Sequence, residues 1–457
     1  MTNMLLLVTA PFYAMLLTSG IRSHSCPVLG WITSKYHRFR NNFVRIAYIS
    51  RLFSGIANGL RKGRWEPRGV PTVYRLLEKL DTSSHDLHIV FTIKDVYTEW
   101  DANKTSMVSA SGLSSSITVV PYLPFQKLKG MKASGYLREL YHYAQIRKIL
   151  ANINPDLVYF DRVNIYAAAL TSLTSSLPVV WRIMGVPPAM HDVLIGKDPI
   201  SRITRLSYRA PFARVICSQD GSGGKQWMEK ALAPNTPRSL LLNGVDKLDG
   251  RPLPESIRSL TNSEKTKVLF VSRLVEHKGC LDFTKAACKV LSQFPNDFSF
   301  FVVGTGPFEQ SMRELARKSE SSHNIHFLGS LIHQDIAPLH RECDIYVSLN
   351  EMSNLTNANL EAMRSGLCII MPSSPGFRHI DEDTDGLISS NLVWRLPEAN
   401  RIDALSNVLI HLHHNPEERK AQARSMQCRA NEFIPSWEER IHKEVSLLER
   451  IVASRPK

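Results

Sequence analysis

Short apolar runs recur along the chain from residue 44 onward, with stretches of helical spacing and Gly- or Pro-containing turns between them. Such runs, bounded by turn residues, predict buried strands. Their alternation with helical segments predicts an α/β protein built on parallel sheets. The predicted strands are 44–50, 87–93, 117–120, 154–160, 178–185 with its following loop, 214–218, 267–272, 299–303, 325–330, 343–349 and 367–371.

The stretch from Glu351 to Gly366, EMSNLTNANLEAMRSG, lies between two of these strands. Asn354 or Thr356 can cap a helix that starts near Asn357 and ends at Gly366. The free N–H groups and the positive dipole end at such a helix start can bind a phosphate. Glu361, one turn into the helix, can accept hydrogen bonds from a sugar diol. The alternative is an ordinary amphipathic crossover helix with a surface Glu.

Three other turns follow predicted strands. Arg273 and Lys278 lie on the loop after strand 267–272, where two cations can converge on adjacent phosphates. The alternative is that both are solvated. Gly304 and Gly306 form a Gly-rich turn that brings backbone close to a ligand, although a lone GxG is weak evidence. Gly329 ends the next strand.

The order of these motifs (RLxxxKG, VVGTGP, FLG, LTNANLEAMRSG) resembles the C-terminal domain of the GT-B retaining glycosyltransferases of family 4. The resemblance implies the GT-B fold, in which two Rossmann-like doubly wound domains face each other across a cleft and a C-terminal helix crosses back to the first domain. The implied parts are an N-terminal extension (1–43), an acceptor-binding domain (44–247), a nucleotide-sugar-binding domain (248–435) and a crossover helix (436–457).

The resemblance also implies roles for residues. Arg273 and Lys278 would hold the donor diphosphate, the turn before the helix would give it backbone N–H groups, and Glu361 would bind the nucleotide ribose. Breaking the bond to the anomeric carbon builds negative charge on the leaving diphosphate, which these groups would stabilise. The implied donor-binding residues are Gly304, Gly306, Gly329, Ser353, Asn354, Leu355, Thr356 and Asn357.

One position departs from the family pattern. Ser353 stands where the family usually has the first of two glutamates, near the donor sugar. Either Glu351, two residues earlier, or Asn354 could take its place, and the sequence does not decide between them. The departure bears on which sugar is transferred.

In the N-terminal half, residues 51–68 read as a long basic loop that contains several glycines. By resemblance, this loop and Gly69 would face the cleft and meet the acceptor or a phosphate; the alternative is a disordered loop. Asp161, after strand 154–160, would bind an acceptor hydroxyl or form a surface pair with Arg162. The Gly-rich turn 219–224 is either a helix-start anion site or a simple tight turn.

Composition indicates the number of domains, the cellular compartment and the kind of partner. A chain of 457 residues fits two or three domains. Its seven cysteines are scattered without a CxxC pair, which indicates reduced thiols in a cytosol-like compartment. Residues 1–65 hold no Asp or Glu but nine Lys and Arg, part of a net charge of +14. Such a surface suits an anionic membrane or a polyanionic acceptor. No nucleic-acid-binding motif is present, so we do not expect that partner.

The leader contains an uncharged, mostly apolar run over residues 4–21, at the short end for a membrane span. Basic residues after it would keep the following domain cytoplasmic if it inserted. The leader is therefore a membrane-associated segment, a transit segment, or not part of the working protein. We expect a cytoplasmic protein, peripheral or N-terminally anchored at the inner face of a membrane.

We therefore predict a retaining glycosyltransferase that moves a sugar from a nucleotide-sugar donor to a glycan or lipid-linked acceptor, in polysaccharide or glycolipid biosynthesis. We expect no cofactor and no metal, because the acidic triplet 381–383 follows the donor site in a solvated turn. The alternative is a non-catalytic nucleotide-sugar-binding scaffold. A dehydrogenase would need a strand-GxGxxG-helix unit, and a phosphorylase a pyridoxal-phosphate lysine motif; neither is visible.

Overall fold

The strands of this chain form two open sheets. The structure is a computed structural model that describes residues 43–94, 104–124, 134–247, 252–373 and 383–454. Residues from Val44 onward form one compact unit. The leader and the acidic positions 381 and 382 lie outside the described residues. In the described part of the chain, no helix has the length and apolar character needed to cross a membrane.

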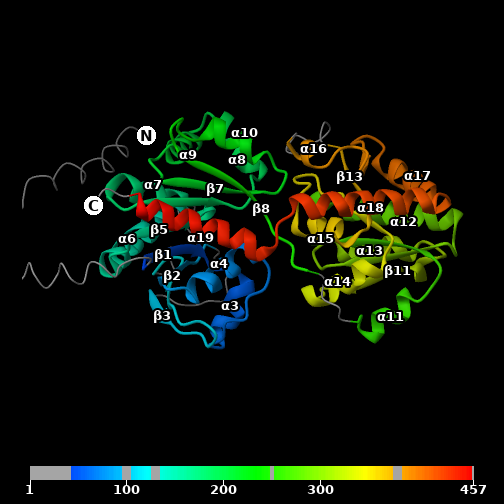
Figure 1. Cartoon of the computed structure of the whole chain (residues 1–457), viewed down its shortest axis with the longest axis horizontal. Coiled ribbons are helices and arrows are strands. Elements are labelled where there is room, and N and C mark those ends of the chain that lie inside the picture. The colour runs from blue at the N-terminus through cyan, green and yellow to red at the C-terminus, as the bar shows by residue number, and fades with distance from the viewer. Residues whose placement is uncertain (1–42, 95–103, 125–133, 248–251, 374–382, 455–457) are drawn as a thin grey trace, which may run out of the picture. The chain divides into compact units, whose positions relative to one another are not determined.

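The first sheet has the strand order β3-β4-β2-β1-β5-β6-β7-β8 (Figure 1). Every neighbouring pair is parallel except β3 with β4, so only the edge strand runs the other way. The strands are β1 (Arg45–Arg51), β2 (Asp86–Thr92), β3 (Ser106–Val108), β4 (Ser116–Val120), β5 (Leu157–Asp161), β6 (Val179–Ile183), β7 (Arg214–Gln219) and β8 (Arg238–Leu242).

Helices cover both faces of this sheet, which explains why its central strands are apolar at almost every position. Along β1, Ile46 and Tyr48 pack with one set of helices, whereas Ala47 and Ile49 pack with the other. The helices are α3 (Ser54–Arg61), α4 (Pro71–Asp81), α6 (Ser134–Ile153), α7 (Ile165–Thr174), α8 (Pro188–Ile195), α9 (Pro199–Tyr208) and α10 (Gly224–Ala231), with the short helix η3 (Arg162–Asn164).

The second sheet is parallel throughout, in the order β11-β10-β9-β12-β13-β14. Its strands are β9 (Thr266–Val271), β10 (Phe298–Val303), β11 (Ile325–Gly329), β12 (Ile345–Val347), β13 (Cys368–Pro372) and β14 (Trp394–Leu396). The helices are α11 (Glu255–Thr261), α12 (Cys280–Gln293), α13 (Glu309–Arg317), α14 (His333–Glu342), α15 (Asn357–Ser365), α16 (Asp383–Leu387), α17 (Arg401–His414) and α18 (Pro416–Phe433), with η4 (Glu276–Lys278) and η5 (Ser322–Asn324).

The last helix, α19 (Trp437–Ala453), returns to the first sheet (Figure 1). A capping box between Ser436 and Glu439 starts it. Trp437 and Ile441 then pack into the same apolar core as α3 and α4. The predicted crossover helix and the two-domain α/β fold are therefore confirmed.

Two expectations about irregular segments are wrong. Residues 51–68 are not a long loop, because α3 occupies much of that stretch. A Cβ at Gly55 would lie 1.9 Å from the Arg68 carbonyl oxygen, so this glycine allows close packing and is not a sign of flexibility. The polar, Pro-containing stretch 247–266, which the sequence predicts to be a linker, contains α11, whose Ile257 packs into the second core.

Candidate functional site

Residues that follow the strands of both sheets line one cleft. In parallel sheets the carboxyl ends of the strands lie at one edge, where ligands bind. The cleft measures about 480 Å³, within the range of small-molecule sites. Its lining is Ser50, Arg51, Phe53, Val70, Pro71, Thr72, Asp161, Arg162, Val163, Met184, Ser218, Asp220, Asn243, Arg273, Lys278, Ser353, Leu355, Thr356 and Asn357.

Arg273 and Lys278 both line this cleft, as expected from the loop that holds them. Burial, together with the neighbouring Arg273, lowers the pKa of Lys278 to about 8. Gly279 follows with a φ of 68°. A Cβ there would lie 2.4 Å from the Leu349 side chain, so only glycine fits. The structure therefore keeps two cations close together in the cleft, where their repulsion and desolvation cost free energy. A bound anion would offset that cost.

Gly304 and Gly306 lie behind the cleft instead of lining it. A Cβ at Gly304 would approach the Ser272 carbonyl oxygen to 1.8 Å, and one at Gly306 would approach the Leu274 carbonyl oxygen to 2.3 Å. These glycines let the backbone on either side of Arg273 pack against the β10 turn. Gly329 is farther back, where its carbonyl accepts from the Gly304 amide at 2.8 Å. The three glycines support the Arg273 loop from behind.

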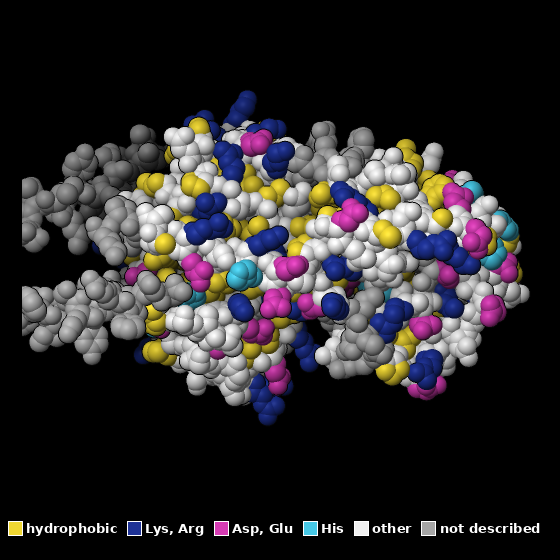
Figure 2. Space-filling model, viewed as in Figure 1, with side chains coloured by type: hydrophobic (Ala, Val, Ile, Leu, Met, Phe, Trp, Pro, Cys, Tyr) yellow, Lys and Arg dark blue, Asp and Glu magenta, His cyan; other side chains and the backbone are white. Residues whose placement is uncertain are grey.

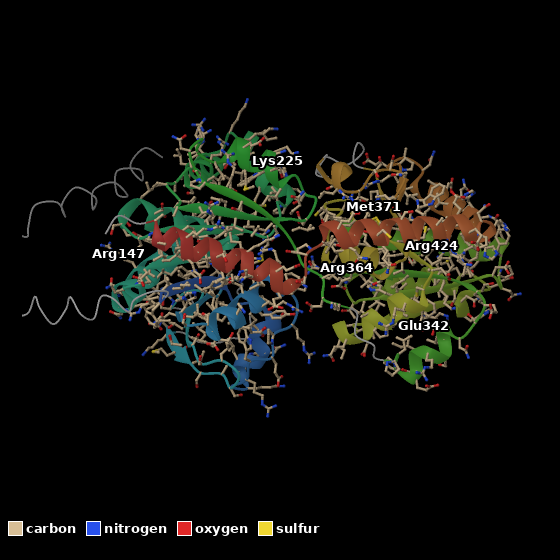
Figure 3. All side chains as sticks on the ribbon, viewed as in Figure 1. Arg147, Lys225, Glu342, Arg364, Met371 and Arg424 are labelled. Atoms are coloured by element: carbon tan, nitrogen blue, oxygen red, sulfur yellow. The ribbon has the colours of Figure 1, made fainter. Side chains whose placement is uncertain are left out.

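The start of α15 also faces the cleft. Thr356 is the N-cap, and its side chain accepts from the Asn359 amide at 3.3 Å. The Asn357 side chain accepts from Asn243 Nδ2 at 2.7 Å. Arg364, labelled in Figure 3, donates to the Ile434 carbonyl at 2.7 Å and so fixes the other end of the helix. The first-turn amides of a helix have no intrahelical acceptor, which leaves α15 suited to an anion.

The Leu355 amide, however, is already used. It donates to the Asp220 carbonyl at 2.8 Å, which joins the turn after β7 to the turn before α15. The prediction that this N–H is available to a diphosphate is therefore wrong for this arrangement. The remaining donors at the helix start are the amides of Asn357 and Ala358, because the Asn359 amide donates to Thr356.

The structure separates the three candidates for the missing glutamate. Ser353 lines the cleft, and its hydroxyl accepts from Asn350 Nδ2 at 2.7 Å. Glu351 does not line the cleft, and Arg401 binds its carboxylate at 2.8 Å. Asn354 is fully buried and also absent from the cleft wall. Only the serine is placed to meet a ligand, so the carboxylate is not replaced by a neighbour.

Glu361 lies on α15 beyond the cleft lining. Burial raises the pKa of its carboxyl to about 8, and Asp246 adds to the increase while Arg75 opposes it. Arg75 itself binds Asp246 at 2.5 Å. Glu361 is thus protonated at neutral pH in the ligand-free protein, next to a second carboxylate that already has a partner.

Of the two candidate acceptor residues, Asp161 lines the cleft and Gly69 does not. Asp161 is buried, and its carboxylate accepts from the Ser50 hydroxyl at 2.6 Å, the Arg51 amide at 2.9 Å and Asn164 Nδ2 at 2.8 Å. It holds the ends of β1 and β5 together and is not part of a surface pair. Gly69, with a φ of 70°, leads into the cleft-lining start of α4.

Asp220 was missed as a site residue, although the sequence placed its Gly-rich turn at the cleft. Burial raises the pKa of its carboxyl to about 6, while hydrogen bonds from Ser222 oppose the increase. A Cβ at Gly185 would lie 2.0 Å from Asp220 Oδ2, so the glycine makes room for the carboxylate. Asn243 also lines the cleft and was missed as well.

Metal ligands are not gathered in the described residues, where no group of three His, Cys, Asp or Glu side chains could hold an ion. The side chains of the acidic triplet lie outside what the structure describes. The cleft's charges are therefore those of Arg51, Arg162, Arg273, Lys278, Asp161 and Asp220.

Two doubly wound parallel sheets, a cleft at their carboxyl ends and a returning C-terminal helix define the GT-B fold of glycosyltransferases. Residues 254–427 match the family model of the glycosyl transferases group 1. Residues 254–427 are thus similar to the glycosyl transferases group 1 domain, in a chain whose fold is GT-B.

Solved structures agree on the fold over nearly the whole chain. The sucrose-phosphate synthase of Thermosynechococcus elongatus is 14% identical, with a TM-score of 0.65 over 90% of this chain and 100% of that one. Anabaena HepE in complex with UDP and glucose is 14% identical, with a TM-score of 0.59 over 89% of this chain and 100% of that one. WaaG, a glycosyltransferase involved in lipopolysaccharide biosynthesis, is 14% identical, with a TM-score of 0.58 over 88% of this chain and 99% of that one.

Two curated relatives are similar in sequence over part of their length. A 2-deoxystreptamine N-acetyl-D-glucosaminyltransferase of Streptomyces fradiae is 27% identical over 251 residues, which cover 51% of this chain and 58% of that protein. An uncharacterized glycosyltransferase of Haemophilus influenzae is 26% identical over 159 residues, or 35% of this chain and 42% of that protein. The chain thus spans about half the length of these relatives.

Proposed function

We propose that this chain is a glycosyltransferase that moves a sugar from a nucleoside-diphosphate sugar to a hydroxyl of a glycan or lipid-linked acceptor, with retention of anomeric configuration. The observation that carries the proposal is the convergence of Arg273, Lys278 and the start of α15 on one cleft. The two cations come from the loop between β9 and α12 and the helix start follows β12, and all three favour an anion.

The proposed chemistry follows from where charge develops. Departure of the nucleoside diphosphate places negative charge on its terminal phosphate. Arg273 is permanently charged and can bind two phosphate oxygens, while Lys278 gives a compact second charge. Because burial already lowers the pKa of Lys278, its ammonium gains more from an anion than a solvated lysine would. Both cations thus stabilise the leaving group more than the intact donor.

Other parts of the site have supporting roles in this proposal. Glu361 accepts hydrogen bonds from the ribose hydroxyls of the donor after losing its proton. Ser353 faces the transferred sugar, where a hydroxyl in place of a carboxylate gives a weaker and uncharged contact. No metal is needed, since the two cations neutralise the diphosphate. Retention of configuration, with the acceptor entering on the face that the diphosphate leaves, is carried over from the family resemblance.

One observation favours a second candidate, a non-catalytic nucleotide-sugar-binding scaffold. The Asp220 carbonyl takes the Leu355 amide, and Ser353 replaces the usual carboxylate. In that reading the cleft keeps its anion-binding cations but lacks contacts for turnover. The two candidates predict the same nucleotide binding and differ only in transfer.

The first experiment is a thermal-shift panel with UDP, GDP, ADP and CDP, and with their sugar conjugates. At a hundredfold excess over the Kd, binding stabilises the fold by about 2.7 kcal/mol. We expect one nucleotide to stabilise the wild type and Lys289→Ala, whose lysine is exposed on α12, but not Lys278→Ala. Equal shifts in all three proteins would contradict the site assignment.

The second experiment measures nucleoside-diphosphate release with that donor, in the presence of EDTA and of candidate acceptors. We expect turnover by the wild type and a loss of about 10²- to 10³-fold in Arg273→Ala, the usual effect of removing one such donor. Binding without turnover under any acceptor would favour the scaffold. Complete inhibition by EDTA would exclude the metal-free mechanism.

A further inference from the structure

Helix α9 exposes apolar side chains that a helix packed on a globular core normally buries. The residues it buries against the protein are Ser201, Thr204 and Tyr208. Its exposed positions include Ile200, at 46%, and Ile203, at 56%. A surface helix normally buries its apolar stripe and exposes its polar one. Helix α9 therefore presents an apolar stripe to its surroundings.

This stripe continues along the preceding turn. Ile195, which ends α8, is 80% exposed, and Leu206 on α9 is 71% exposed. Arg205 donates to the carbonyls of Val193 and Gly196 at 2.6 and 2.5 Å, which fastens the end of α8 to α9. Many of the most exposed large apolar side chains of the described residues thus lie in one short segment of the fold. We call Ile195, Ile200, Ile203 and Leu206, with the basic residues beside them, the α8–α9 surface.

Basic residues flank the apolar stripe. Lys197, Arg202 and Arg209 are exposed, and by helical spacing Arg202 and Arg209 lie on the side of α9 next to Leu206. None of the three has an ion-pair partner among the residues that the structure describes. Asp198 is engaged at the start of α9, where it accepts from the Ile200 and Ser201 amides. Figure 2 shows yellow and dark blue side chains next to one another in the region that Figure 1 labels α8 and α9.

We propose that the α8–α9 surface docks on an anionic lipid bilayer. Exposed aliphatic side chains enter the boundary between head groups and acyl chains, and the cations beside them meet the lipid phosphates. Each Lys or Arg near such a surface adds about fivefold to partitioning. Because α9 is already folded onto α7 and β6, no ordering of a free peptide opposes the binding.

The position of this surface would bring a membrane-borne acceptor to the cleft. Helix α8 begins directly after the loop that follows β6, and Met184 in that loop lines the cleft. The Val186 amide donates to the Ser222 hydroxyl at 2.8 Å, which ties the loop to the turn that carries Asp220. The docking proposal does not depend on the proposed function, because vesicle binding needs neither donor nor turnover.

The test is flotation of the full chain with vesicles of phosphatidylcholine alone, or of phosphatidylcholine mixed with phosphatidylglycerol. We expect binding to the anionic vesicles, weakened by salt. The double variant Ile203→Asp with Leu206→Asp should lose at least tenfold in partitioning, as should Arg202→Glu with Arg209→Glu. Leu140→Asp, an exposed apolar position on α6 at 62%, is the matched control and should bind like the wild type.

The substituted side chains are exposed, so thermal melting should show all variants folded. Unchanged vesicle binding by both double variants would place any membrane contact elsewhere, such as the basic leader, and overturn the proposal. Absence of binding by the wild type would overturn it too. A wild-type dimer that Ile203→Asp converts to monomer, without any vesicle binding, would assign this surface to a second copy of the chain.

Discussion

Two groups of charged side chains lie inside this molecule. The surroundings of one group favour the charged forms, whereas those of the other favour the neutral forms. Beneath α19, Arg182, Arg440 and Glu444 are each at most 1% exposed. In the cleft and just behind it lie Lys278, Asp220 and Glu361. In the first group opposite charges stabilise one another, whereas in the second group burial disfavours the charged forms.

In the α19 cluster the pKa shifts of Glu444 and Arg182 both favour the charged forms. Burial alone would raise the pKa of Glu444, but the attraction of Arg182 and Arg440 leaves it below its ordinary value. Burial would lower the pKa of Arg182, yet Glu444 raises it above its ordinary value. Arg440 Nη1 lies 2.5 Å from the Glu444 carboxylate, and the Tyr159 hydroxyl donates to the same group. The opposite charges of this cluster thus stabilise one another.

In the cleft the shifts run the other way. Burial lowers the pKa of Lys278 to about 8 and raises those of Asp220 and Glu361 to about 6 and 8. Each group therefore favours its neutral form more than it would in water. A ligand that brings charge or hydrogen bonds would relieve that cost. The direction of the pKa shift therefore distinguishes charges that stabilise the fold from charges that would interact with a substrate.

The largest expected effect concerns the charged cluster at α19. Glu444→Gln keeps the shape of the side chain but leaves two buried arginines without their counter-charge. We expect a loss of about 3–5 kcal/mol in the free energy of unfolding, measured by urea denaturation. Glu449→Gln on the same helix removes a partner of His85 that is 46% exposed, and it should cost at most about 1 kcal/mol. Similar losses in both variants would show that the cluster is not specially stabilising.

The next effect concerns the charges of the cleft. Lys278→Met removes a charge whose pKa the fold already lowers, so the variant should be at least as stable as the wild type at pH 7. Transfer should nevertheless fall by about 10²- to 10³-fold, because the leaving diphosphate loses a cation. Lys289→Met, on the exposed face of α12, should change neither quantity. A strongly destabilised Lys278→Met would place this lysine with the structural charges instead.

The sequence predicts the frame of this site because that frame depends on local patterns. Apolar runs mark the strands, and Thr356 and Gly366 bracket α15 as a capping residue and a left-handed glycine should. The loop that carries Arg273 was placed correctly for the same reason. Residues 51–68 were misread because glycine is typical of loops, and only the structure shows that Gly55 faces the Arg68 backbone.

The rest of the site depends on contacts between segments that are distant in the chain. Local sequence patterns do not predict such contacts. The Asp220 turn meets Leu355 although the two are far apart in the chain, and the same is true of Arg182 and Glu444. An arginine inside the apolar run VVWRI was the one available signal that a buried carboxylate must lie nearby. Its partner could not be named before the position of α19 was known.

A smaller effect follows from the protonation of Glu361. Its pKa is raised in the folded state, so between pH 4.5 and about 8 the folded protein holds a proton that the unfolded chain has released. The free energy of unfolding should therefore fall as pH rises through this range, by up to about 1.4 kcal/mol for each pH unit from this group. Glu361→Gln should remove that contribution and weaken donor binding. Parallel stability curves for the two proteins would mean that Glu361 is ionised throughout and does not belong with the cleft charges.

The smallest expected effect concerns Asp220, which shares the cleft with Lys278. Burial raises its pKa to about 6, so in the wild type this carboxyl is neutral below that pH and negative above it. The negative form opposes a donor diphosphate, and the KM for donor should rise by about twofold to tenfold as pH passes 6. In Asp220→Asn the rise should be absent, so that the variant binds donor more tightly than the wild type at pH 7 and equally at pH 5. Asp403→Asn, at an exposed side chain on α17, should follow the wild type. A hundredfold loss of turnover in Asp220→Asn would instead give this carboxylate a direct part in the reaction.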